Sequence, residues 1–457
     1  MVRILSLAFT FSILLFSCKN QPEKNQQPNI IFILVDDMGW GDIGVFWQNQ
    51  RKKTNDRSEP WQMTPSLDAL ANGGAMLTNH YCPAPVCAPS RASLLLGVTQ
   101  GHANVRDNQF DKDLQDTYTM GNVLQAAGYH TAAIGKWGLQ GRGPEVEAPH
   151  WPAHPLERGF DYYLGYIRHR DGHEHYPKEG LYRGSMKVWE NRKEISDDLD
   201  KTFTTDLWTA TAKKYIKERV QDQEETKPFF LYLPFTIPHA NNEGTRGTGD
   251  GQDVPDYGIY EKENWTNPNK GQAAMITRMD ADIGRLMARL NQYKLTENTL
   301  VVFSSDNGHH REGGNDPDFF DANGPLRGMK RDLYEGGIRV PTIAHWPGHI
   351  KPDSASDHPA YFGDLMATAA ELLGVSAPGQ LDSVSILPTL LGQADRQLKR
   401  EFLYWEFLER RGAQAVVLGE TGRWKALRKQ SATAPIELYD LDNDLGETKD
   451  IAAKHPE

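Results

Sequence analysis

A continuous apolar run near the start of the chain constrains the fold more than any other segment. Residues 30–35 read IIFILV, and a run of this kind is typical of a strand that is buried on both faces. Two further apolar runs, 229–235 and 299–304, each follow a segment with helical periodicity, 204–220 and 271–290. Strands that alternate with helices predict an α/β fold with a doubly wound, mostly parallel sheet.

The pattern changes after about residue 375. Four short segments have the composition of strands joined by turns: 401–407, 415–418, 424–428 and 436–439. Such a series indicates a small antiparallel sheet. With 457 residues, the chain is long enough for two domains. We expect an α/β catalytic domain over residues 29–375 and a smaller α+β domain over residues 376–457.

The first 18 residues have the features of an export signal. A basic residue near the start is followed by a short apolar run and by LFSC at residues 15–18. The run is too short to span a membrane comfortably. The tetrapeptide looks like a bacterial lipobox, in which Cys18 becomes the lipidated first residue of the mature protein. An ordinary cleaved signal is the alternative. Residues 19–28 are polar and are interpreted as a flexible tether.

Acidic side chains directly follow two of the predicted strands. Asp36 and Asp37 come after the first apolar run, and Asp306 and Asn307 come after the third. Sites in open α/β sheets gather at the carboxyl ends of strands, so these residues are expected to meet. Their oxygens suit a hard divalent cation such as Ca²⁺. A strand-end cap or a turn is the alternative for either pair alone.

A cysteine stands at the start of a predicted helix. Residues 87–97 read CAPSRASLLLG. A helix start supplies free N–H groups and a partial positive charge, which suit an anion or a nucleophile that attacks one. Pro89 fits an early helical position, and Arg91 adds a planar cation suited to oxyanions. A buried, inert thiol is the alternative for Cys87.

The pattern C-x-P-S-R-x-x-L-L-x-G resembles the type I sulfatases. In that family a maturase oxidises the cysteine to formylglycine, an aldehyde whose hydrate is the nucleophile. Residues 324–341, GPLRGMKRDLYEGGIRVP, and residues 437–441, ELYDL, match the same family. The resemblance therefore covers about residues 29–457. It implies an alkaline phosphatase-like fold and one Ca²⁺, with the modified Cys87 as a further ligand. Sulfatases usually continue beyond such a stretch, which suggests a truncated C-terminal domain.

Three basic residues match sulfatase positions that line the sulfate pocket: Lys136, His239 and Lys330. The resemblance implies that the two lysines contact sulfate oxygens and that Arg91 anchors the hydrated aldehyde and the metal site. Charge builds on the leaving oxygen during S–O cleavage, so an acid must protonate the departing alcohol. We expect His239 to be that acid, with Lys330 as the second choice. The alternative for each of the three basic residues is a solvated position on the surface.

The chain departs from many sulfatases at Gly138, where they carry a histidine that takes a proton from the formylglycine hydrate. A histidine-rich segment, RHRDGHEHY, follows at residues 168–176. We expect His173 to move into the vacated space and act as the base, with His175 as the second choice. The alternative is that both are exposed loop histidines.

The same departure indicates a substrate. Gly138 and the runs 312–314 and 323–327 resemble sulfatases that act on 4-O-sulfated galactose or N-acetylgalactosamine. The resemblance places four side chains near the sugar: His175, His310, Asn323 and Arg327.

The sequence thus predicts an exported, lipid-anchored sulfatase in the bacterial periplasm or at the cell surface. Its expected partners are a sulfated carbohydrate, a formylglycine-generating maturase and, through Cys18, a membrane. The formal net charge of −11 argues against non-specific nucleic-acid binding. With Cys18 lipidated and Cys87 modified, Cys82 has no partner, so no disulfide is expected.

Two other functions are compatible with these features. The first is a phosphomonoester or phosphonate hydrolase on the same fold. A two-metal site suits phosphate monoesters better, and one clear set of ligands is evident here. The second is a lipoprotein that binds sulfated glycans without catalysis because Cys87 is never modified.

Overall fold

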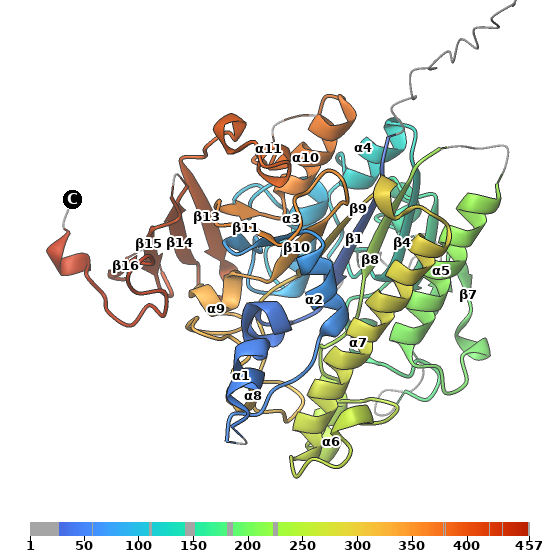
Figure 1. The fold of residues 1–457 in the computed structure, drawn as a ribbon, viewed down its shortest axis with the longest axis horizontal. Coiled ribbons are helices and arrows are strands. Elements are labelled where there is room, and N and C mark those ends of the chain that lie inside the picture. Colours follow the sequence, from blue (N-terminus) through green and yellow to red (C-terminus); the bar gives the residue numbers. More distant parts are fainter. Residues whose placement is uncertain are drawn as a thin grey trace, which may run out of the picture.

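A mixed sheet with ten strands in the described part of the chain forms the centre of the structure (Figure 1). The computed structural model describes residues 27–455 except for 57, 109–111, 142–150, 181–185, 223–226, 378, 380, 420 and 432. The predicted export signal, Cys18 and most of the predicted tether lie outside the described residues. The strands are ordered β11 (Ser354–Ser356), β2 (Ala75–Leu77), β10 (Thr342–His345), β9 (Thr299–Ser305), β1 (Asn29–Val35), β8 (Phe229–Pro234), β4 (His130–Lys136), β5 (Tyr162–Tyr166), β6 (Val188–Glu190) and β7 (Lys193–Glu194).

The middle of this sheet is parallel. Strands β9, β1, β8, β4 and β5 all run in one direction. Towards one edge, β10 is antiparallel to both β9 and β2, and towards the other, β6 is antiparallel to β5 and β7. The predicted doubly wound, mostly parallel sheet is confirmed, and the outer strands make it mixed.

The central position of β1 in the sheet explains why its sequence is continuously apolar. Alternate side chains of a strand point to opposite faces of the sheet. Ile30 and Phe32 belong to one buried core, whereas Ile31 and Ile33 belong to another. Each face of the sheet is therefore covered, and a polar residue in this strand would enter one core or the other.

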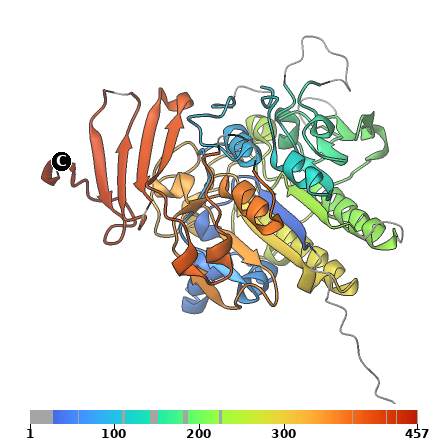
Figure 2. The same cartoon turned by 90° about the horizontal axis from the view of Figure 1, so that it is seen from above.

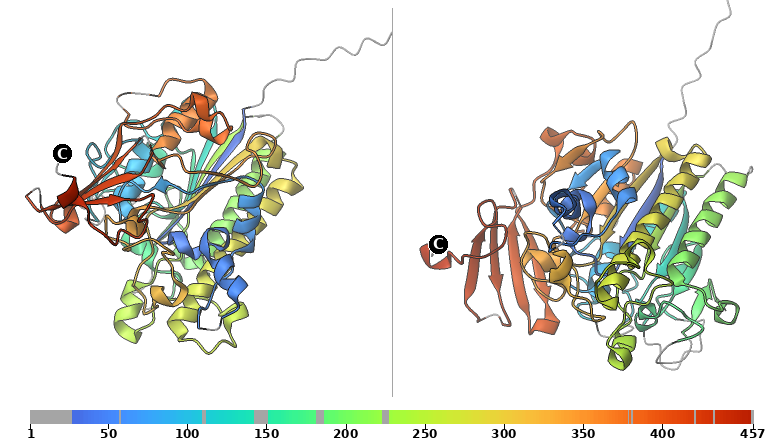
Figure 3. Two further views of the ribbon diagram at one scale, coloured as in Figure 1. Left: turned by 60° about the vertical axis from the view of Figure 1, so that its left-hand side comes forward. Right: turned by 60° about the horizontal axis from the view of Figure 1, so that its bottom comes forward.

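Helices cover both faces of the sheet. One face carries α2 (Pro65–Asn72), α5 (Thr204–Gln221) and α7 (Asn267–Gln292), and α7 packs against both α2 and α5 (Figure 3). The other face carries α3 (Cys87–Leu96), α4 (Met120–Ala126) and α10 (Asp364–Leu373). The remaining elements are short: α1 (Asn49–Thr54), α6 (Asn242–Thr248), α8 (Pro317–Phe320), α9 (Glu335–Ile338), α11 (Leu387–Leu390), β3 (His80–Tyr81) and β12 (Ala360–Tyr361). Among the described residues, no helix combines the length and apolar character needed to cross a bilayer.

A second, smaller sheet lies to one side of the main body (Figure 2). It consists of β13 (Phe402–Phe407), β14 (Ala413–Leu418), β15 (Trp424–Arg428) and β16 (Ile436–Asp440). Neighbouring strands are antiparallel, which confirms the sheet predicted for this part of the chain. Trp405 is buried and donates from Nε1 to the carbonyl of Cys82 at 2.7 Å, so the small sheet is fixed to the chain just before α3.

A buried ionic cluster also joins the small sheet to the main body. Lys425 of β15 has its Nζ 2.8 Å from Glu335 Oε1 and 2.9 Å from Glu447 Oε1. Glu335 begins α9 and also pairs with Arg339. Burial would raise the pKa of Glu335, but Lys425 and Arg339 hold it below its usual value. Lys425 is thus the cation shared by two buried carboxylates.

Replacing Lys425 by methionine is expected to destabilise the protein by about 3–5 kcal/mol, because it removes the cation shared by the buried Glu335 and Glu447, of which Glu335 alone also pairs with Arg339. Urea unfolding at neutral pH measures the effect. The control is Lys429→Met, which removes a surface pair in which Lys429 Nζ lies 2.7 Å from Glu437 and is half exposed. Such pairs contribute about 0–1 kcal/mol. Equal losses in the two variants would contradict the structural role given to Lys425.

Candidate active site

The carboxyl ends of β1 and β9 bring three aspartates together. The strands are parallel neighbours with Val35 beside Ser305, so the residues that follow them meet at one edge of the sheet. The Asp306 N–H donates to the Val35 carbonyl at 3.0 Å, and the Asp37 N–H donates to Asp306 Oδ1 at 3.1 Å. Asp37 has a φ of 70°, which turns the chain sharply after Asp36. All three aspartates are buried.

Cys87 lies against this group of carboxylates. It is the first residue of α3, whose residues are all buried. Its Sγ is 3.2 Å from Asp36 Oδ1 and 3.7 Å from Asp37 Oδ1. Ser90 donates from Oγ to the Asp306 carbonyl at 2.6 Å, which fixes the helix start to the end of β9. Burial, together with the three aspartates, raises the pKa of the Cys87 thiol. The helix start and the two strand ends therefore converge on one point.

The donors around Cys87 fit a divalent cation. Asp36, Asp37, Cys87 and His239 each offer one ligand atom, and these atoms lie within 4.8 Å of one another. Asn307 Oδ1 is buried and has no hydrogen-bond partner among the described residues. A buried amide oxygen without a donor is unusual, and a cation beside it would satisfy it. Oxygen atoms dominate the set, as hard cations prefer.

Two buried cations compensate the aspartates. Arg91 donates from Nε to Asp306 Oδ2 at 2.9 Å, and its Nη2 lies 2.7 Å from the same oxygen. Lys136 donates from Nζ to Asp36 Oδ2 at 2.7 Å. Burial alone would raise the pKa of Asp36, but Lys136 and Arg91 hold it well below its usual value. The Asp306 carboxylate thus binds Arg91 and the Asp37 N–H, whereas Asp36 and Asp37 face the thiol.

Lys330 lies at the centre of a second polar group. Its Nζ is 2.6 Å from Asp37 Oδ2, 3.1 Å from Glu312 Oε2 and 3.2 Å from His239 Nε2. His239 uses Nδ1 as a donor to the Ala240 carbonyl at 2.7 Å, which leaves Nε2 as the acceptor that faces Lys330. Burial, and then the charge of Lys330, hold the pKa of His239 well below its usual value. The structure therefore brings the predicted pocket residues Lys330 and His239 into contact.

The space beside Gly138 is filled by His169 and not by His173. Gly138 has a φ of 73°, and a Cβ built there would lie 3.1 Å from His169 Nδ1. His173 instead stacks on His239, with ring centroids 4.4 Å apart, and its Nδ1 lies 3.5 Å from Glu243 Oε2. This placement corrects the expectation that His173 moves into the vacated position. It arises because the backbone turns through a 3₁₀ segment, Arg170–His173, directly after His169.

The other histidines of this region are buried and hold the backbone of the site. His175 bonds through Nε2 to the His239 carbonyl at 2.9 Å. His310 bonds through Nε2 to the Pro238 carbonyl at 3.1 Å, and its Nδ1 accepts the Glu312 N–H at 2.9 Å. Both side chains therefore position the segments that carry His239 and Glu312. Neither His173 nor His175 is the exposed loop histidine considered as the alternative.

None of the four predicted sugar-binding residues lines the cavity above Lys330: His175 and His310 bond to the backbone as described, and Asn323 and Arg327 lie elsewhere. Asn323 donates to the Leu326 carbonyl within its own turn. Arg327 donates to the Glu447 carbonyl at 2.7 Å and lies over the Tyr334 ring, 4.0 Å from its centroid. Arg327 thus binds the C-terminal region, and neither side chain lines the cavity above Lys330. Both expectations came from the run 323–327, and the contacts of Asn323 and Arg327 hold that part of the chain in place.

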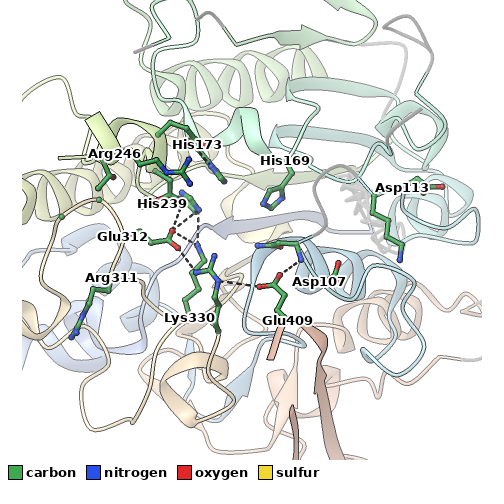
Figure 4. A pocket seen from close by; sticks show the side chains of 18 residues that line it. Asp107, Asp113, His169, His173, His239, Arg246, Arg311, Glu312, Lys330 and Glu409 are labelled. Carbon is green, nitrogen blue, oxygen red and sulfur yellow. Dashed lines mark hydrogen bonds and ion pairs between the residues drawn. The ribbon is translucent and has the colours of Figure 1, made fainter. Parts of the chain in front are cut away.

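A cavity of about 1370 Å³ opens above Lys330 and His239 (Figure 4). Its walls include His169 and His173, and Glu312 lies beside Lys330 on its floor. Sequence reasoning missed several lining residues: Asp107, Asn108, Arg246, Glu312, Arg331 and Glu409. The one available signal was position, because Glu312 follows the Asp306–Asn307 pair closely and Arg331 follows Lys330. Glu409 comes from the region of the small sheet, so both parts of the chain shape the cavity.

Comparison with known proteins agrees with this geometry. The family model described as Sulfatase matches residues 28–375, and a model described as N-sulphoglucosamine sulphohydrolase, C-terminal, matches residues 328–456. N-acetylgalactosamine-6-sulfatase of Homo sapiens is 30% identical over 400 residues, which cover 83% of this chain and 68% of that protein. N-acetylgalactosamine-6-O-sulfatase of Bacteroides thetaiotaomicron is 26% identical, with 96% and 92% covered.

Solved structures show the same fold. The crystal structure of Ps i-CgsB in complex with k-i-k-neocarrahexaose superposes with a TM-score of 0.74 at 26% identity, and covers 94% of this chain and 90% of that one. The chain spans about two thirds of the length of the mammalian N-acetylgalactosamine-6-sulfatases, 66% for that of Canis lupus familiaris. The family model covers most of the chain and includes both strand ends, the Cys87 helix and Lys330. The chain therefore belongs to the sulfatase family, enzymes that hydrolyse sulfate esters.

Proposed function

We propose that the chain removes the O4 sulfate of galactose or N-acetylgalactosamine in a sulfated glycan. The observation that carries the proposal is the position of Cys87, which lies against Asp36 and Asp37, while Asp37 also binds Lys330 beside His239. The named relatives in Homo sapiens and Bacteroides thetaiotaomicron favour an N-acetylgalactosamine sulfate. The choice of O4 depends on the resemblance carried by Gly138. O6 is the second candidate, because both relatives are named 6-sulfatases.

Two groups complete the proposed site. When present, formylglycine at position 87 would supply the nucleophile, and a Ca²⁺ held by Asp36, Asp37, Asp306, Asn307 and residue 87 would supply positive charge next to the sulfate. The buried, partnerless Asn307 Oδ1 and the surrounding carboxylates support this assignment. Lys136 binds Asp36 and Lys330 binds the neighbouring Asp37, so their ammonium groups reach the same group of carboxylates from different elements and are placed to bind sulfate oxygens.

The departing sugar oxygen needs a proton, and His239 is our proposed donor. Its Nδ1 proton is bound by the Ala240 carbonyl and its Nε2 accepts from Lys330, so Nε2 must take up a proton before it can pass one to the sugar oxygen in the cavity. The Lys330 ammonium, which donates to this Nε2 at 3.2 Å, is the proposed source: it gives a proton to Nε2 and becomes a neutral amine, and the Nε2–H proton passes to the departing oxygen. The stacked His173 ring fixes the orientation of His239. Geometry of this kind is what general acid catalysis requires.

His169 is our proposed proton acceptor in the second half of the reaction. Its ring fills the place next to Gly138, and it lines the cavity with His173. Burial, followed by the charge of Lys136, keeps the pKa of His169 well below its usual value, so the ring is neutral and able to accept. This assignment replaces the earlier expectation of His173, whose ring is engaged by His239 and Glu243.

The phosphatase alternative is disfavoured by the position of Lys330. Asp37, His310 and Glu312 form a second group whose ligand atoms lie within 4.8 Å of one another. The Lys330 ammonium bonds to two of these carboxylates and lies where a second cation would otherwise bind. A site with one divalent cation, in which the Lys330 ammonium takes the place of a second, suits a singly charged sulfate ester better than a doubly charged phosphate monoester.

The proposal extends to maturation and location. Oxidation of Cys87 requires a formylglycine-generating maturase as a partner. The lipobox-like LFSC sequence supports export and lipidation at Cys18, which would hold the enzyme at a membrane in the periplasm or at the cell surface. A glycan-degrading enzyme in that place would meet its substrate outside the cytoplasm.

A panel of matched esters tests the activity. With maturase co-expression, we expect turnover of an aryl sulfate but not of the matched aryl phosphate. Among singly sulfated sugars, the 4-O-sulfates of galactose or N-acetylgalactosamine should have the highest kcat/KM, followed by the 6-O-sulfates. Mass spectrometry of the Cys87 peptide should show the aldehyde. Faster turnover of the aryl phosphate than of the aryl sulfate would support the phosphatase alternative. An intact Cys87 thiol, with binding of sulfated glycans but no turnover, would support the non-catalytic alternative.

Two histidine variants are expected to respond differently to the leaving group. His239→Ala should lower kcat on a sugar sulfate about 10²–10⁴-fold, the range of general acid catalysis. The loss should be much smaller on 4-nitrophenyl sulfate, because nitrophenolate leaves without a proton. His169→Ala should lower turnover of both esters, since its step follows departure of the alcohol. If His173→Ala reproduces that pattern while His169→Ala leaves turnover intact, the acceptor is His173.

Removal of the cation should destabilise the folded protein. The buried aspartates lose their counter-charge in EDTA, so the melting temperature should fall and return on addition of Ca²⁺. At a Ca²⁺ concentration about 100 times Kd, binding stabilises by about 2.7 kcal/mol. Asp37→Asn should abolish the response, whereas Asp318→Asn, which changes an exposed carboxylate paired with Arg311, should retain it. A melting temperature insensitive to both chelator and Ca²⁺ would contradict the metal site.

A further inference from the structure

A second cavity of about 700 Å³ lies outside the site described above. Its aromatic lining residues are Trp61, Tyr260, Trp265 and Phe319. The Trp265 ring stacks on Tyr260 with centroids 5.3 Å apart and meets Phe319 edge-on at 5.5 Å. Tyr260 is buried, whereas Trp61, Trp265 and Phe319 are partly exposed, so three aromatic side chains remain accessible at the cavity wall.

One segment of the chain lines both the aromatic cavity and the catalytic cavity. Residues 311–314 line the catalytic cavity, and Phe319 of α8 lines the aromatic one. A single short segment after β9 therefore contributes to both cavities. Helix α1 borders the aromatic cavity from the other side, where Arg51 donates to the Phe319 carbonyl at 3.2 Å. Figure 1 shows α1 and α8 at the same end of the molecule, beyond the carboxyl end of β1.

The rim of the aromatic cavity carries positive charge. Lys52 and Lys262 both line it, and both are exposed. Neither lysine has an ion pair with the described carboxylates, although Glu263 also stands at the rim. In a chain with a net charge of −11, two uncommitted cations beside accessible aromatic rings are a local departure from the overall charge.

We propose that this aromatic cavity is a second binding site for the sulfated glycan. One sulfate ester of the polysaccharide would lie in the catalytic cavity while a distant part of the same polysaccharide is bound in the aromatic cavity. The proposal rests on the proposed glycan sulfatase activity. Trp61 and Trp265 offer flat apolar faces for the C–H faces of sugar rings, and the indole N–H groups can donate to hydroxyls. Lys52 and Lys262 would bind sulfate groups carried by the same sugar units.

Size and linkage favour this occupant. Sites for small ligands commonly enclose about 300–1,000 Å³ and combine aromatic walls with a few polar groups. A polymer held at one site is present at the other at a high effective concentration, which strengthens binding without any new contact. A small sulfated sugar reaches the catalytic cavity alone and gains nothing from the aromatic cavity. Turnover of the small sulfated sugar therefore depends on the catalytic cavity alone, whereas turnover of the polymer depends on both cavities.

The test compares the double variant Lys52→Glu/Lys262→Glu with wild type. The control is Lys193→Glu/Lys217→Glu, which reverses two exposed lysines on β7 and α5. Substrates are chondroitin 4-sulfate or κ-carrageenan as polymer and the corresponding 4-O-sulfated monosaccharide. We expect kcat/KM on the polymer to fall at least about tenfold in the first variant, equivalent to about 1.4 kcal/mol. Turnover of the monosaccharide should not change, and the control should match wild type.

Binding is measured separately from turnover. Affinity gel electrophoresis of the same proteins through gels containing each polymer should show weaker retardation of Lys52→Glu/Lys262→Glu and of Trp61→Ala. Equal retardation of all proteins, or equal losses on polymer and monosaccharide, would overturn the second site. If wild type is retarded by the polymer but hydrolyses no sulfate ester, the proposed function fails while the second site stands. Melting temperatures close to wild type exclude unfolding as the cause.

Discussion

Three carboxylates buried at one edge of a sheet require compensating charge, and the arrangement of the rest of the structure follows from that requirement. Arg91 comes from α3, Lys136 from the end of β4 and Lys330 from the loop before α9. An uncompensated buried charge costs several kcal/mol, so each of these elements is held against the strand ends by ion pairs as well as by apolar packing. The active site is thus continuous with the core. The same ion pairs that form the proposed sulfate site also join the layers of the fold.

The sequence predicts most of this centre because its information is local. A buried strand followed by acidic residues indicates the edge of the sheet, and two such strands place Asp36 and Asp306 side by side once the sheet is parallel. The Cys87 helix carries its own signature. The parallel direction of the central strands and the small antiparallel sheet both follow from patterns within short segments, and the structure has both.

The course of the loops could not be predicted in this way. Which histidine fills the space beside Gly138 depends on a 3₁₀ turn after His169 and on the stacking of His173 upon His239, contacts between segments far apart in the sequence. Arg327 matched a family run, yet its side chain is bound by Glu447, over a hundred residues later. A motif fixes which residues are present, whereas long-range packing decides which of them face the substrate.

The ion pair between Lys425 and Glu335 connects the small sheet to the segment that carries Lys330. Glu335 lies five residues after Lys330, at the start of α9, and its backbone N–H donates to the Glu447 carboxylate at 2.7 Å. The segment that carries Lys330 is therefore bound at its far end by residues of the C-terminal region. Removing or replacing the small sheet, for example to improve expression, would therefore shift the ammonium that we propose binds the sulfate, and would not affect solubility alone.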